Sequence, residues 1–148
     1  PRRAPLPRRE TMAFQHHLVA REDDIDDLGH VGNQVYLRWV LEVAVAHSNA
    51  LGWPWSAYQA LGAGWVVRRH ELDYLAQVVE GDDVVGSTWI ESWKGVSCVR
   101  RTDLHRGATP VLRAATTWVF IDFASGKPRK IPDEIRALFE QQALRAAQ

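Results

Sequence analysis

Residues 23–39 read DDIDDLGHVGNQVYLRW and place acidic, imidazole and glycine residues directly before an apolar segment. Carboxylates and an imidazole can act as general acids, general bases or nucleophiles. A helix that starts near Asn33 leaves its first backbone N–H groups without intrahelical partners, and such donors stabilise a developing oxyanion. Gly29 and Gly32 let the backbone approach a carbonyl group closely. The stretch can therefore supply an attacking group beside an oxyanion site.

The acidic residues of this stretch are not expected to share one role. We interpret Asp23, Asp24 and Asp27 as solvated loop residues, since charges in loops are mostly exposed. For Asp26 the alternatives are a catalytic carboxylate and an acid that stabilises a turn or the helix start. For His30 they are a functional imidazole and a ring that hydrogen-bonds the backbone.

Other reactive side chains are interpreted as structural. His70 and Cys98 alternate with apolar residues on predicted strands, which favours burial. The same structural role is predicted for His16, His17 and His47. No histidine spacing resembles a metal site, so we expect neither a metal nor another cofactor.

The elements that position these residues follow from hydrophobic periodicity. Apolar residues recur at helical spacing between Asn33 and Leu51, on most sides of the helix, and Gly52 and Pro54 end it. Glu42 follows Arg38 by one helical turn, which predicts an ion pair. Strands are predicted at 14–20, 65–75, 84–93, 96–106 and 111–123, and a short helix begins near Pro132.

This order predicts an α+β fold in which an antiparallel sheet of about five strands wraps around one long central helix. In the strand 65–75, Val66, His70 and Leu72 are expected on one face. Both faces of the strand 111–123 are apolar, and the helix can cover only one of them. A second copy of the chain is the nearest cover for the other face, so we predict a homodimer or larger homo-oligomer.

The element order and one motif resemble a known family. Asp26-x-x-Gly29-His30-Val31-x-Asn33-x-x-Tyr36-x-x-Trp39 is similar to the signature of the hot-dog-fold 4-hydroxybenzoyl-CoA thioesterase family, and also to that of acyl-ACP thioesterases. The resemblance implies hydrolysis of acyl-CoA or acyl-ACP to a free acid and a thiol. In the site it implies, Asp26 is the nucleophile or general base, His30 polarises the carbonyl or orients Asp26, and Asn33 donates its backbone N–H. The substrate contacts that it implies are Gly29, Val31, Gly32 and Tyr36.

Three positions depart from the family pattern. Gly32 stands where the family has the first Asn of an Asn-Asn pair, and Leu28 and Gln77 stand where plant acyl-ACP thioesterases carry an Asn and a Glu. The simpler mechanism with one loop carboxylate is compatible with these residues. Arg100, Arg101 and Arg106 are candidates for contacts with CoA phosphates, with a solvated surface role as the alternative for each. A dehydratase or hydratase of the same fold and a non-catalytic acyl-binding module are the alternative functions.

Composition limits the partners. The chain has 148 residues with 46% hydrophobic and 24% charged residues, which fits one globular domain over 13–148 behind a flexible Pro- and Arg-rich leader over 1–12. The formal net charge is zero, so we expect neither nucleic-acid nor membrane binding. With a single cysteine, a cytoplasmic location is expected.

Overall fold

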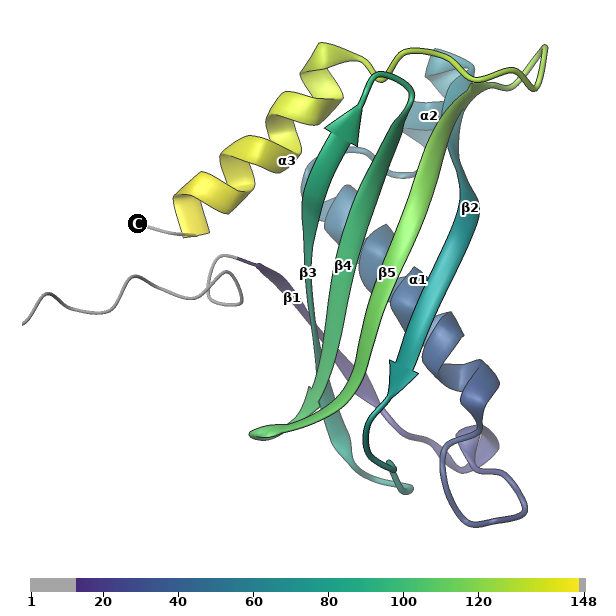
Figure 1. Cartoon of the computed structure of the whole chain (residues 1–148), viewed down its shortest axis with the longest axis vertical. Helices are drawn as coiled ribbons and strands as arrows, with labels where there is room; N and C mark the ends of the chain where they lie inside the picture. The colour runs from purple at the N-terminus through teal and green to yellow at the C-terminus, as the bar shows by residue number, and fades with distance from the viewer. Residues whose placement is uncertain (1–12, 147–148) are drawn as a thin grey trace, which may run out of the picture.

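The structure, a computed structural model, describes the backbone of residues 13–146 and the side chains of residues 13–142. Five strands form one antiparallel sheet in the order β1-β3-β4-β5-β2 (Figure 1). The strands are β1 (Phe14–Val19), β2 (Ala63–Tyr74), β3 (Asp83–Lys94), β4 (Ser97–Arg106) and β5 (Thr109–Asp122). The predicted order of one strand, one long helix and four further strands is confirmed. The leader predicted over residues 1–12 lies outside the described residues.

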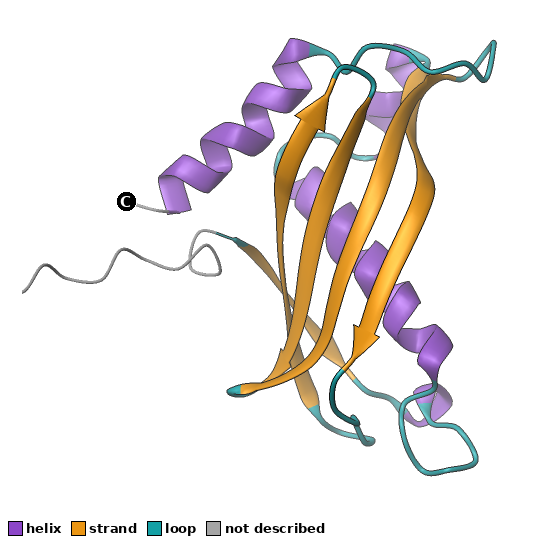
Figure 2. Ribbon diagram, in the orientation of Figure 1, coloured by secondary structure: helices purple, strands orange, loops and turns teal. Residues whose placement is uncertain are grey.

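Within residues 13–146, three α-helices and one short 3-10 helix accompany the sheet. Helix α1 (Asn33–Ala50) lies along one face of the sheet, and Figure 2 shows no helix over the opposite face. Helix α2 (Trp55–Leu61) was not predicted, because seven residues after a proline are too few to show a helical period. Helix α3 (Asp133–Ala146) is longer than the short helix expected. The 3-10 helix η2 spans Glu22–Asp24.

Helix α1 is enclosed because its apolar residues occupy most of its circumference. Trp39, Val40 and Val43 are almost completely buried against the concave face of the sheet. Gly86 on β3 makes this packing possible, since a Cβ atom there would lie 2.6 Å from Val43 Cγ2 and 3.1 Å from Leu104 Cδ2. The helix therefore sits almost on the sheet backbone, and its position along the sheet is fixed by shape.

Strand β2 is an edge strand whose register differs from simple alternation. It pairs with β5 alone within the described chain, and a bulge lies between Val67 and Arg69. The bulge moves Val66 opposite Val119, onto the convex face. The prediction that Val66 shares a face with His70 is therefore wrong, because one extra residue reverses the alternation.

The carboxyl-terminal half of α1 carries a buried histidine. His47 is 1% exposed, stacks on Phe14 and faces the ring of Phe139, so its predicted structural role is confirmed. Its Nδ1 lies 2.9 Å from Arg100 Nη1, and its Nε2 lies 3.2 Å from Gln142 Oε1. Burial, and then the charge of Arg100, lower the pKa of His47 to about 3. His47 is therefore neutral at ordinary pH, with Nδ1 as the acceptor from Arg100.

Arg100 and Cys98 project from β4 toward the same buried region. Arg100 is 5% exposed, so the solvated surface role that was the alternative to a phosphate contact is wrong. The burial predicted for Cys98 is confirmed, and that burial raises the pKa of its thiol to about 12. His70, half-buried on β2, hydrogen-bonds Thr116 Oγ1 through Nδ1 at 2.9 Å, and burial lowers its pKa.

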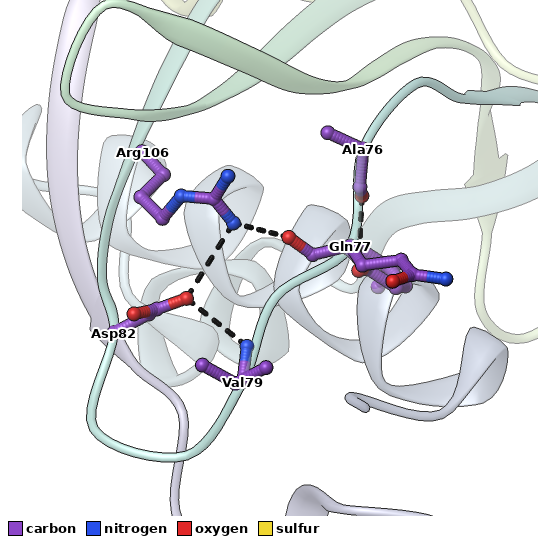
Figure 3. Close-up of polar contacts among 6 residues, drawn as sticks. Ala76, Gln77, Val79, Asp82 and Arg106 are labelled. Atoms are coloured by element: carbon purple, nitrogen blue, oxygen red, sulfur yellow. Dashed lines mark hydrogen bonds and ion pairs between the residues drawn. The ribbon is translucent and has the colours of Figure 1, made fainter. Parts of the chain in front are cut away.

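The loop between β2 and β3 supports the amino end of α1. Arg106 donates through Nη1 to the carbonyl of Gln77 and lies 3.5 Å from Asp82 Oδ2, which also accepts from the Val79 amide (Figure 3). The loop in turn contacts the helix start, since the Val31 amide donates to the Val78 carbonyl at 2.8 Å. Arg106 thus connects the sheet to the loop on which the helix tip rests.

The buried state of His47 predicts acid sensitivity of the fold. The unfolded chain binds a proton on this ring below about pH 6.5, whereas the folded chain binds it only near pH 3. The free energy of unfolding should therefore fall as pH drops below 6.5, by about 2 kcal/mol at pH 5 from this group. His47→Asn should flatten the slope between pH 5 and 7 in denaturant titrations. His17→Gln, at an exposed position, should leave the slope unchanged; equal slopes in all three proteins would contradict the assignment.

Removing the Arg106 guanidinium should loosen the loop without unfolding the sheet. In Arg106→Met, the Gln77 carbonyl and the Asp82 carboxylate lose their common donor. We expect amides of residues 76–82 to exchange with solvent about tenfold faster, which corresponds to roughly 1.4 kcal/mol of local stability. Lys94→Met, at an exposed position at the far end of β3, is the matched control. Unchanged exchange in Arg106→Met would show that the loop is held by other contacts.

Candidate functional site

A tight loop turns the chain back just before α1. Ile25 and Val31 form an antiparallel bridge, and the Asp26 amide donates to the His30 carbonyl at 2.8 Å. The Gly29 amide donates to the Asp26 carbonyl at 3.0 Å, and Gly29 has a φ of +82°, which L side chains rarely adopt. The glycine and the paired ends of the loop therefore bring residue 26 next to the helix start.

The Asp26 carboxylate lies exposed at this helix start. Its Oδ1 accepts from the amide of Leu28 at 2.9 Å and from that of His30 at 3.4 Å. A Cβ atom added to Gly32 would lie 3.9 Å from Asp26 Cβ, which places the side chain beside the N-cap of α1. Oδ2 has no hydrogen bond to any described residue. One oxygen therefore stabilises the turn, and the other remains available to solvent or to a ligand.

The amino end of α1 offers free backbone donors. Gly32 is the N-cap and has no side chain to accept from the first turn. Its own amide donates to the Asp24 carbonyl at 3.0 Å, whereas the amides of Asn33 and Gln34 have no acceptor among the described residues. Tyr74 Oη donates to the Asn33 carbonyl at 3.3 Å and so holds the first turn in place. These amides and the positive end of the helix dipole suit an anionic oxygen.

The remaining residues of the predicted site lie at different depths. His30 is half-buried, and its ring forms no hydrogen bond within the described part of the chain; only its backbone contacts Asp26. Val31 and Tyr36 are 5% and 4% exposed and pack in the core. The Tyr36 hydroxyl lies 3.5 Å from the Ala76 carbonyl, and burial raises its pKa. The structure thus brings Asp26, Gly32 and Asn33 together, whereas Val31 and Tyr36 lie in the hydrophobic core.

Asp24 corrects two of the expectations. It is 6% exposed rather than solvated, and it forms an ion pair with Arg38. Burial alone raises its pKa, but hydrogen bonds from the Arg21 amide and from Arg38 outweigh burial and bring the pKa below its usual value. The predicted pair of Arg38 with Glu42 is therefore wrong, since Arg38 turns toward Asp24; Glu42 lies 3.8 Å from His16 instead.

Two cavities of the described chain do not include Asp26 in their walls. One is a groove of about 720 Å³ between β1, η2 and α1, which includes Asp24 and Arg38. The other, of about 180 Å³, lies at the carboxyl-terminal end of α1. No cluster of His, Cys, Asp and Glu side chains capable of holding a metal is found among residues 13–142. No helix within residues 13–146 is long and apolar enough to span a bilayer.

Solved structures share this arrangement. A 1,4-dihydroxy-2-naphthoyl-CoA thioesterase from Synechocystis has a TM-score of 0.80 at 16% identity, over 86% of this chain and 95% of that one. A gentisyl-coenzyme A thioesterase has a TM-score of 0.76 at 20% identity, over 86% and 99% of the two chains. A hypothetical protein from Staphylococcus aureus in complex with CoA has a TM-score of 0.84 at 14% identity, over 89% and 84%. At these identities the likeness establishes a common fold.

Sequence comparison defines the family. A search of curated proteins finds no significant match. The model of the thioesterase-like superfamily matches residues 20–139, which include the loop carrying Asp26, the helix α1 and the whole β2–β5 sheet. The predicted α+β hot-dog fold is confirmed by this match and by the solved structures. The chain belongs to the thioesterase-like superfamily.

Proposed function

We propose that this protein is a thioesterase that hydrolyses an acyl-CoA or acyl-ACP thioester to a free acid and a thiol. The observation that carries the proposal is the position of the Asp26 carboxylate beside the uncapped amino end of α1. Thioester hydrolysis needs an attacking group on one side of the carbonyl carbon and donors to its oxygen on the other. Family membership and the CoA thioesterase named among the structural neighbours agree with this chemistry.

The free oxygen of Asp26 is the group that starts the reaction. The two amides on Oδ1 fix the carboxylate plane, so Oδ2 is presented in one direction. As a nucleophile, Oδ2 attacks the carbonyl carbon, the C–S bond breaks, and the thiolate leaves; water then hydrolyses the mixed anhydride. As a general base, it takes a proton from the water that attacks the same carbon. The geometry serves both routes.

The amino end of α1 is proposed to stabilise the oxyanion that forms during the reaction. The amides of Asn33 and Gln34 would donate hydrogen bonds to the carbonyl oxygen and stabilise the negative charge that develops on it. His30 is assigned to the substrate side of the loop, because its ring is free of other hydrogen bonds among the described residues. Gly29 and Gly32 keep this surface open to the thioester, since neither residue carries a Cβ atom.

A second copy of the chain is proposed to complete the site. Neither of the two cavities described above includes Asp26, and the proposed partner would supply the wall for the acyl group. Edge strand β2 is twelve residues long, exposes Val66 and Val67, and ends at Tyr74 beside Asn33. Pairing of two β2 edges would cover the unpaired backbone of this strand and bring the partner subunit to the helix tip.

Asp26→Asn tests the mechanism. It keeps the oxygen that accepts from Leu28 and His30 but removes the charge, so the loop should persist and turnover should fall at least about 100-fold. Thiol release would be followed with a thiol-reactive dye over short, long and aromatic acyl-CoAs. Asp27→Asn, at an exposed neighbouring position whose side chain forms no hydrogen bond or ion pair with a described residue, should retain activity.

Three other outcomes would favour different functions. Full activity of Asp26→Asn would remove Asp26 from the mechanism. A change in enoyl absorbance without thiol release would identify a hydratase or dehydratase. Tight binding of acyl-CoA without any turnover over the whole panel would identify an acyl-binding module.

Lysine substitutions on the β2 edge, followed by a measurement of molecular mass, test the proposed homodimer. We expect a light-scattering mass of about 34 kDa, twice the 16.8 kDa of the chain. Val66→Lys combined with Val67→Lys should shift the mass toward one chain, because two lysines on each strand would repel and need water. Val96→Lys, at a position of similar exposure in the β3–β4 turn, should keep the dimer. A monomeric native protein would exclude this arrangement.

A further inference from the structure

An aromatic cavity lies at the end of α1 opposite to Asp26. Its volume is about 180 Å³, and it is bounded by the last turns of α1, by α2, by the concave face of the sheet and by α3. Five of the seven tryptophans of the chain line it, namely Trp53, Trp55, Trp65, Trp93 and Trp118. Ala44 and Ser48 of its wall follow Asn33 by eleven and fifteen residues, which is about 16 to 23 Å along the helix. The cavity is therefore separate from the helix-tip site.

A buried cation faces this aromatic cavity. Arg100 is 5% exposed and lines the wall. Its Nη1 donates to His47 Nδ1 and to Thr88 Oγ1, each at 2.9 Å, and its guanidinium lies 5.6 Å from the ring centre of Phe139. Each of these partners is neutral, since the pKa of His47 is about 3. No carboxylate of the described residues pairs with Arg100.

Two residues of the cavity wall each have a buried donor without an acceptor behind the cavity surface. Arg100 Nε and Trp118 Nε1 are inaccessible to solvent and form no hydrogen bond. They come from adjacent strands, because Trp118 pairs with Cys98 in the register of β4 and β5, and Arg100 is two residues farther along on the same face. A buried donor without a partner costs about 1–3 kcal/mol, and more when it is charged. Burial lowers the pKa of Arg100 only to about 10, so the charge persists at neutral pH.

We propose that this cavity is a binding site for a small organic carboxylate. Its apolar body would pack among the tryptophans, and its carboxylate would pair with the guanidinium of Arg100, which lines the cavity. A carboxylate supplies the negative charge that no described residue provides beside Arg100. The proposal is independent of the thioesterase function, since it uses none of the residues at the helix tip.

Phenylacetate and its neutral isostere phenylacetamide test the proposal on the full chain. The two probes have nearly the same shape, so a difference between them reports the charge. Tryptophan fluorescence and the rise in melting temperature would follow binding, since a ligand of the folded state stabilises it. We expect phenylacetate to bind at least about tenfold more tightly than phenylacetamide, equivalent to roughly 1.4 kcal/mol.

Variants assign the binding to the cavity. Arg100→Met removes the charge with an apolar side chain of similar length, so the preference for the acid should vanish. Arg101→Met is the matched control, because Arg101 is the next residue on β4, is exposed and pairs with Glu91. Arg101→Met and Asp26→Asn should both bind phenylacetate as the native chain does.

Several results would overturn the proposal. Equal affinity for acid and amide in the native chain would do so, as would no binding of phenylacetate below about 10 mM. An unchanged preference in Arg100→Met would place the binding elsewhere. If Arg100→Met fails to fold by circular dichroism, Arg100→Gln removes the charge but keeps an amide that can donate toward His47 and Thr88. It should bind phenylacetate and phenylacetamide equally well; a retained preference for phenylacetate would contradict the proposal.

Discussion

The enclosure of α1 by the sheet is the constraint on which the rest of the structure depends. A helix that is apolar on most sides has no stable place at a surface, and five strands curl around it to remove that area from water. The close approach at Gly86 fixes the depth of the helix, because the side chain of Val43 already fills the space of any Cβ atom. Both ends of α1 are thereby held at defined places on the sheet.

Much of this architecture follows from hydrophobic periodicity, because burial on one face or on all faces imposes a period on the sequence. The long helix and the β3–β5 meander were predictable for that reason. Local departures from the period were not. The bulge at Val67 changes the face of Val66, and α2 is too short to carry a periodic signal. Both features are decided by contacts between segments that lie far apart in the sequence.

The sequence predicted which loop forms the candidate site, but it did not predict the separate environments of the acidic residues in that loop. Asp24 and Asp26 each lie between Ile25 and another aspartate. Asp24 is buried and forms an ion pair with Arg38, whereas Asp26 is exposed at the helix start. The distinction comes from α1, which brings Arg38 beside Asp24 within about its first one and a half turns. Arg100 shows the same limit, since strand alternation predicts its face but not that the covering helix would bury a cation.

The two ends of α1 present opposite demands on charge. At the amino end, free amides and the positive end of the dipole face solvent and favour an anion, which is where Asp26 lies. At the carboxyl end, the negative end of the dipole lies near Arg100 and offsets part of the cost of its burial. A dipole end carries about half a charge and is distributed over several carbonyls, so it cannot replace a carboxylate with oriented lone pairs. The buried charge of Arg100 therefore keeps a demand for an anion that the helix leaves unmet.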